Sequence, residues 1–311
     1  MKTNVKLLII FFMLSGCILR ADNVLPAGRL FMSVLQQNGT ARVMAMGSSG
    51  VSFVGDSSAL FWNPAGLGRV ERVEIGLHHN SGLDNSGKET LVIGSNMNEW
   101  GGFAMSLNYG NSGSFDVRDE SGNLTGIENA LGYGISLGWG KMWQNGVSAG
   151  IALKAQREIL AESDYNEFAV DAGLMWEIIP LLNLGLTYTN LGNLIHNFAP
   201  ASGLRAGISY DMESFYKSRV LLAAAAEIQS NGTARFNMGI EDVFAAMFSV
   251  RLGYTANLTN QELTGITGIT TGIGVKIEDV AFDYAYLPFG NLGANHRVSF
   301  TYVTDFFSET R

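Results

Sequence analysis

Two glycine-rich stretches contain residue types that occur in catalytic sites. Gly146-Val147-Ser148-Ala149-Gly150 has the G-x-S-x-G spacing of a hydrolase nucleophile. That chemistry needs the serine on a sharp turn between a strand and a helix, whereas this serine lies in a strand-like segment. Gly138-Trp139-Gly140-Lys141 resembles a phosphate loop but lacks the Ser or Thr that follows the lysine. We therefore expect a protein that is not an enzyme.

The side chains that could bind a metal are poorly spaced for it. His78 and His79 are adjacent, so in a strand they point to opposite faces and cannot hold one ion together. An acidic segment at residues 116–123 lacks the spacing of an EF-hand loop. We expect neither a metal nor a cofactor.

The composition is that of a protein with little water-facing surface. Hydrophobic residues make up 47% and charged residues 15% of the 311 residues, against a usual charged share of about 25%. The net charge is -8. With no run of Lys and Arg, the chain is not expected to bind nucleic acid.

The first residues predict an export signal. Two lysines precede the apolar residues 7–14, which are too few to span a bilayer as a helix. Cleavage near Ala21 would remove a signal peptide of residues 1–21. Cys17, the only cysteine, ends a lipobox-like Leu-Ser-Gly-Cys and is an alternative lipidation site. No later segment reaches about 18 apolar residues, so any further membrane crossing must use strands.

From about residue 70 onward, apolar residues alternate with small or polar ones. Phe103, Met105, Leu107 and Tyr109 share one face of a strand-like segment. The same alternation recurs at residues 134–140, 182–189, 280–286 and 297–302. This period predicts an all-β chain.

Charged residues in these segments lie on the face opposite the aromatics. They are Lys154, Asp171, Arg205, Asp211, Arg251, Lys276, Asp283 and Arg297. A soluble β-sandwich would also alternate and is the alternative. An aromatic-aliphatic face outside and a small, polar face enclosed by the sheet is the pattern of a transmembrane barrel, in which these charges face the lumen.

The spacing predicts about fourteen antiparallel strands, an even number that suits a bacterial barrel. They lie near residues 70–79, 89–97, 100–110, 129–143, 145–158, 164–177, 181–190, 203–212, 218–229, 233–241, 245–256, 265–277, 279–288 and 296–304. Asn145-Gly146 suits a tight type I′ hairpin turn. Four gaps are expected to be long polar loops: 111–128, 191–202, 256–264 and 288–295.

Residues 41–68 do not follow this alternation. Asp56-Ser57-Ser58 predicts the start of a short helix, because short polar side chains accept hydrogen bonds from its first amides. Asn63-Pro64 predicts its end, because proline pushes the preceding residue out of helical geometry. The stretch is too apolar for a free tail and too broken for a spanning strand.

These motifs resemble the PorV/PorQ family of bacterial outer-membrane proteins, relatives of the FadL-type fatty-acid transporters. The resemblance rests on Met46-Gly47, on Asp56 to Ala59, on Trp62 to Leu67 and on later segments, covering nearly the whole mature chain in order. The later segments are residues 147–154, 168–174, 189–192, 283–290 and 296–300.

The resemblance implies a domain organisation. Residues 22–69 would form an N-terminal plug with short helices inside a barrel of residues 70–305, followed by a tail of residues 306–311. The plug or gating candidates are Gly47, Asp56, Trp62, Asn63, Pro64 and Gly66. We expect a small apolar pocket between the plug and the inner wall.

The resemblance also implies a location in the bacterial outer membrane, in contact with its lipid. Its first functional implication is a secretion-associated barrel, of the type IX kind, that binds or anchors exported cargo proteins or secretion components. The alternative is FadL-type transport of a hydrophobic small molecule that binds in the lumen. A structural outer-membrane protein without a transport role is a third reading.

Overall fold

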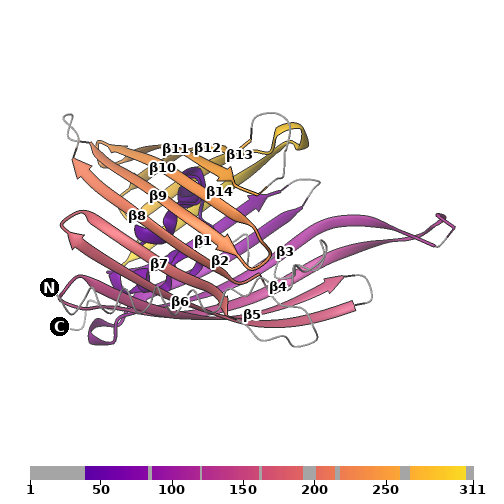
Figure 1. Ribbon diagram of the computed structural model, residues 1–311, viewed down its shortest axis with the longest axis horizontal. Coiled ribbons are helices and arrows are strands. Elements are labelled where there is room, and N and C mark those ends of the chain that lie inside the picture. Colours follow the sequence, from indigo (N-terminus) through magenta and orange to yellow (C-terminus); the bar gives the residue numbers. More distant parts are fainter. Residues whose placement is uncertain are drawn as a thin grey trace.

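The protein is an antiparallel β-barrel that closes on itself. The structure, a computed structural model, describes residues 39–82, 86–119, 121–160, 163–191, 201–213, 218–259 and 267–305. Within these residues, fourteen strands pair in chain order and β14 pairs with β1 (Figure 1). The all-β transmembrane barrel and its strand number are therefore confirmed. The proposed signal peptide, Cys17 and the tail lie outside the described residues.

The strands have the following bounds: β1 Val73–Ser81, β2 Gly87–Asn96, β3 Gly102–Arg118, β4 Leu124–Met142, β5 Val147–Leu160, β6 Ser163–Ile179, β7 Leu182–Leu191, β8 Gly203–Glu213, β9 Arg219–Gln229, β10 Ala234–Phe244, β11 Phe248–Asn257, β12 Ile269–Ile277, β13 Val280–Pro288 and β14 Ala294–Thr304.

Alternate residues of each strand point outward and inward. On β11, Leu252 is 51% exposed whereas the neighbouring Arg251 is 4% exposed. Outward-facing Leu, Ile, Phe and Tyr recur on all strands from β1 to β14. A soluble surface does not carry so continuous an apolar belt, so this face meets lipid.

The two ends of the barrel differ. Short turns follow β4, β6, β10 and β12 at the end where the chain enters β1 and leaves β14. At the other end, β3 and β4 continue past their neighbours as a projecting hairpin (Figure 1). The expectation of a long loop at residues 111–128 is wrong. Beyond the lipid both faces of a strand meet water, so the period-two signal disappears there.

The turn after β4 also differs from its prediction. Gly146 has a positive φ of 76°, and Asn145 does not have the positive φ that a type I′ turn requires. Trp143 N–H donates to the Val147 carbonyl and Gly146 N–H to the Trp143 carbonyl, at 2.9 and 3.0 Å. This is a type I turn followed by a left-handed glycine, a longer hairpin loop.

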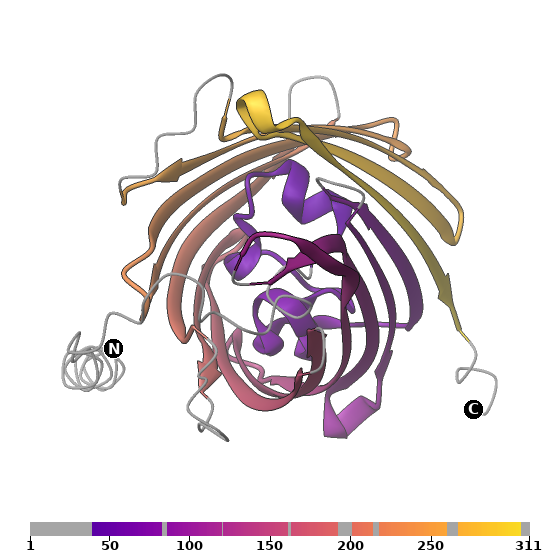
Figure 2. The same cartoon turned by 90° about the vertical axis from the view of Figure 1, so that its right-hand side faces the viewer.

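Within the described residues, four short helical segments joined by turns lie in the lumen, where Figure 2 shows the N-terminal part of the chain. They are α3 Ala41–Ala45, η1 Gly50–Ser52, α4 Ala59–Trp62 and η2 Pro64–Arg69. The segment α3 contacts β11 to β14, η1 contacts β7 to β9, and η2 contacts β3 to β6. No helix in the described residues is long and apolar enough to cross a membrane.

The plug supplies most of the hydrophobic core. Val43, Leu60, Phe61, Trp62 and Leu67 are buried in one cluster. The wall contributes mainly small residues to this cluster, Ala104 and Ala152 among them. The barrel's apolar side chains face lipid, so the residues that pack inside must come from the N-terminal segment.

Candidate ligand site in the barrel lumen

Asn63 organises the plug turn. Its backbone N–H donates to the Ala59 carbonyl and so ends α4. Its side-chain oxygen accepts from Ala65 N–H, 3.1 Å away, at the start of η2. Its amide nitrogen donates to the carbonyls of Val51, at 2.8 Å, and Leu174, at 3.0 Å. This fully buried side chain therefore joins two plug segments, η1 and η2, to β6.

The neighbouring candidates shape the same turn. Pro64 begins η2, where its missing N–H costs nothing. Asp56 lies two residues before Ser58, the N-terminal cap of α4, and its carboxylate accepts from Ser58 N–H at 2.9 Å. The helix therefore begins slightly later than Asp56 itself. Gly66 lies against the Val54 carbonyl, where a Cβ atom has no room.

Gly47 marks the closest approach of the plug to β10 and β11. It has a φ of 63°, and an added Cβ atom would lie 2.7 Å from Tyr254 N. Its N–H donates to Thr270 Oγ1 at 3.1 Å, and its carbonyl accepts from Thr255 Oγ1 at 3.0 Å. Only glycine fits both the conformation and the space.

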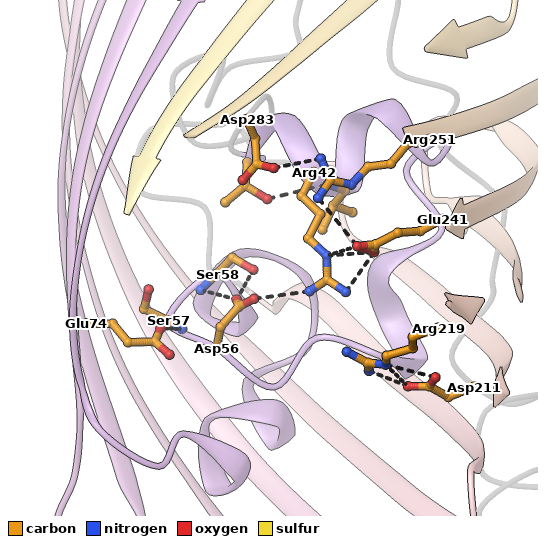
Figure 3. Close-up of polar contacts among 12 residues, drawn as sticks. Arg42, Asp56, Ser57, Ser58, Glu74, Asp211, Arg219, Glu241, Arg251 and Asp283 are labelled. Atoms are coloured by element: carbon orange, nitrogen blue, oxygen red, sulfur yellow. Dashed lines mark hydrogen bonds and ion pairs between the residues drawn. The ribbon is translucent and has the colours of Figure 1, made fainter. Parts of the chain in front are cut away.

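A charge network fastens the plug to the wall (Figure 3). Arg42 of α3 contacts Glu241 of β10 through Nε, at 2.9 Å, and Nη2, at 2.8 Å. Arg42 also lies 3.5 Å from Asp56. Glu241 is in turn 3.4 Å from Arg251, which contacts Asp283 at 2.6 Å. The network thus joins both halves of the plug to three strands.

Arg42 keeps its positive charge in this half-buried position. Burial opposes the charge, but Glu241 and Asp56 outweigh burial and raise the pKa of the Arg42 guanidinium above its usual value. The ring of Phe53 lies beneath the guanidinium, 5.4 Å from ring centroid to Cζ. The guanidinium therefore stays charged at neutral pH.

Other contacts hold the plug around the barrel. Ser57 N–H donates to Glu74 of β1 at 2.6 Å, and Arg69 donates to Asn183 of β7 at 2.7 Å. Ala41 N–H donates to Ser299 of β14 at 2.8 Å. Two of these contacts lie on the neighbouring strands β1 and β14, and the third lies half-way round the barrel on β7, so the plug cannot shift as a unit without breaking several of them.

Seven of the eight charges expected to face the lumen are buried or half-buried on the strands, and Lys276 is the exception. Lys154 and Asp171 form a buried ion pair, with Nζ 2.5 Å from Oδ2. Arg205 pairs with Glu227 at 3.2 Å, and Asp211 pairs with the more exposed Arg219.

The other four predicted charges have different surroundings. Arg251 and Asp283 belong to the plug network. Arg297 donates to the Gly39 carbonyl at 3.2 Å. Lys276 lies at the turn end of β12 and is exposed.

Several residues of the site were not predicted from the sequence. Glu227 follows a run of four alanines, which has no alternation to read. Glu241 is next to Asp242, so the pattern does not say which of the two faces inward. Arg42 lies in the plug, outside the strand pattern. Both glutamates could have been found by extending the inward–outward alternation along β9 and β10 from their outward-facing apolar residues.

A cavity of about 470 Å³ lies between the plug and the long-loop end of the barrel. Plug residues Met44, Ser48 and Trp62 line it, and Phe289 of the β13–β14 connection adds a second aromatic ring. Arg205, Arg235, Arg297 and Glu227 line it from the strands. The expected pocket is therefore present where the plug meets the wall, but it is amphipathic and carries more cations than carboxylates.

The catalytic and metal candidates do not contribute to this pocket. Ser148 is buried within β5. Among the described residues, no group of three or more His, Cys, Asp or Glu side chains could hold a metal ion.

Solved structures with the same architecture are FadL-like barrels. The Ralstonia pickettii toluene transporter TbuX has a TM-score of 0.63 and 14% identity, over 86% of this chain and 99% of that chain. The CymD monoaromatic hydrocarbon channel has a TM-score of 0.58 and 15% identity, over 86% and 97%. A Pseudomonas aeruginosa FadL homologue has a TM-score of 0.55 and 12% identity, over 86% and 98%.

These identities establish a shared fold. No protein-family model matches the chain, and no curated protein matches it in sequence. Two of the three neighbours are a transporter and a channel; none is an enzyme by its description. The chain has the fold of the FadL-like bacterial outer-membrane β-barrels.

Proposed function

We propose that this barrel binds a small hydrophobic or amphiphilic molecule in its lumen and transports it across the outer membrane. The observation that carries the proposal is the cavity of about 470 Å³ between the plug and the long-loop end. Ligand pockets in proteins span about 300–1,000 Å³ and combine apolar walls with a few polar groups. The described neighbours TbuX and CymD, a toluene transporter and a hydrocarbon channel, have the same fold.

In this proposal the plug forms the floor of the binding site. Trp62 and Met44 offer apolar surface, and the contacts of Arg42 and Asn63 hold that surface still. A rigid plug keeps polar solutes from passing freely through the barrel, while the ligand is bound between the plug and the inner face of the strands. Gly47, Asp56, Trp62, Asn63, Pro64 and Gly66 then act as the structural elements of this floor.

The secretion-associated function rests on the sequence resemblance to PorV/PorQ proteins alone. A protein that anchors exported partners needs an exterior docking surface, whereas the ligand-sized cavity described above lies in the lumen. Transport is therefore the function that we favour. The two functions predict different phenotypes in a strain that lacks the gene.

An uptake measurement tests the proposal. Cells that produce the wild-type barrel should accumulate a neutral aromatic dye faster than cells without it. Thr255→Phe adds a ring to a residue that lines the cavity and should slow uptake several-fold. Thr233→Phe, in the turn after β9, is the matched control and should leave uptake unchanged. Equal uptake with and without the barrel, together with loss of exported surface proteins in the gene deletion, would contradict transport.

A further inference from the structure

A row of polar side chains crosses the wall beside the cavity. Arg205 of β8 is in register with Glu227 of β9, Glu227 with Arg235 of β10, and Arg235 with Asn257 of β11. All four point into the lumen and line the cavity. The row thus places one carboxylate between two guanidinium groups.

The Glu227 carboxylate already forms an ion pair with Arg205. Glu227 contacts Arg205 at 3.2 Å and accepts from Gln229 at 2.7 Å. Arg205 also lies over the Trp62 ring, 5.4 Å from its centroid. These contacts fix Arg205 between the wall and the plug and balance its charge.

Arg235 lacks such a balance. Its hydrogen bond goes to the neutral side chain of Asn257, from Nε to Oδ1 at 3.2 Å. Among the residues that the structure describes, no carboxylate forms an ion pair with Arg235. The two Nη nitrogens of the Arg235 guanidinium are therefore available to donate hydrogen bonds to a carboxylate or phosphate group of a ligand. Arg297 adds a second positive charge to the cavity from β14.

Four large apolar side chains also line the cavity, among hydroxyl and amide groups such as those of Ser48, Thr255 and Asn295. Met44 and Trp62 come from the plug, and Leu287 and Phe289 come from the β13 side. We propose that the pocket selects a compact molecule that joins an aromatic-sized apolar body to a single acidic group, and that Arg235 binds that group. This inference rests on the proposed function and names its substrate class. A neutral hydrocarbon would leave the Arg235 guanidinium without an anionic partner in the occupied pocket.

Two probes of equal shape test the inference. Isothermal titration of the purified barrel with 4-phenylbutyrate and with its neutral amide compares an acid with an uncharged isostere. We expect the acid to bind at least about tenfold more tightly, since a hydrogen-bonded charge contributes about 1.5–3 kcal/mol. Arg235→Gln should remove this preference, and Arg235→Lys should retain part of it.

The controls separate this inference from the proposed function. Arg219→Gln changes an exposed arginine that pairs with Asp211 outside the cavity, and the preference should persist. Equal affinity for acid and amide in the wild type would overturn the acidic specificity and leave transport standing. If neither the acid nor the amide bound to the wild-type barrel, the proposed function would be contradicted as well. Migration of every variant as a folded barrel in unheated gels excludes misfolding.

Discussion

Glu241→Gln is the substitution that most sharply tests how the plug is held. The carboxylate is 4% exposed and contacts two guanidinium groups, Arg42 at 2.8 Å and Arg251 at 3.4 Å. The neutral amide keeps the shape of the side chain but cannot balance either cation. Arg251 still has Asp283 at 2.6 Å, whereas Arg42 retains only Asp56 at 3.5 Å. The loss therefore falls mainly on the contact between plug and wall.

The magnitude follows from this geometry. Removing one partner of a buried ion pair costs about 3–5 kcal/mol, because the other charge stays buried without compensation. Arg42 is partly exposed and keeps one weak partner, so we expect a loss of about 3 kcal/mol in the free energy of unfolding. The double variant Arg42→Met, Glu241→Met removes both charges. Its loss in the free energy of unfolding should be smaller than the sum of the losses for Arg42→Met alone and Glu241→Met alone.

Urea unfolding in lipid vesicles, followed by tryptophan fluorescence, measures these changes. Arg72→Gln is the control, because Arg72 forms exposed ion pairs with Asp279 and Asp305 outside the lumen. That variant should unfold at the wild-type urea concentration. If Glu241→Gln were as stable as the wild type, or if the double variant showed simple additivity, the network would not hold the plug.

Three further substitutions test other contacts by the same unfolding assay. Asn63→Ala removes three side-chain hydrogen bonds and should cost about 3 kcal/mol, at about 1 kcal/mol each; an unchanged stability would refute its structural role. Gly173→Ala places a Cβ atom against the Asn63 side chain and should lower the free energy of unfolding, whereas Gly87→Ala, with nothing within 4 Å, should not. Asp171→Asn leaves Lys154 buried beside a neutral amide and should cost about 3–5 kcal/mol, a loss that Lys154→Met in the same chain should partly reverse.

The barrel could be predicted from the sequence because lipid imposes its pattern on every spanning strand. Leu252 and Arg251 differ in chemistry because one meets lipid and the other the lumen. The same reasoning failed for residues 111–128, which lie beyond the lipid as parts of β3 and β4. Where the solvent is the same on both faces, alternation carries no information.

The interior was harder to predict. The helix α3 has five residues, and its N-cap contact, Val43 N–H to Thr40 Oγ1, is long at 3.5 Å. So short a segment shows no helical period in the sequence. The contact between Arg42 and Glu241 joins residues 199 positions apart, and its partners depend on how the plug is turned within the barrel. Sequence patterns report local environment, not such pairings.

The central claim is that a small hydrophobic or amphiphilic molecule binds beside the plug inside the barrel. Photolabelling with a neutral aromatic diazirine, followed by peptide mass spectrometry, locates the bound molecule directly. The account predicts labels on Met44, Trp62 and Phe289, and competition by unlabelled ligand. Labels confined to lipid-facing residues such as Leu107 and Ile135, unaffected by competition, would contradict it.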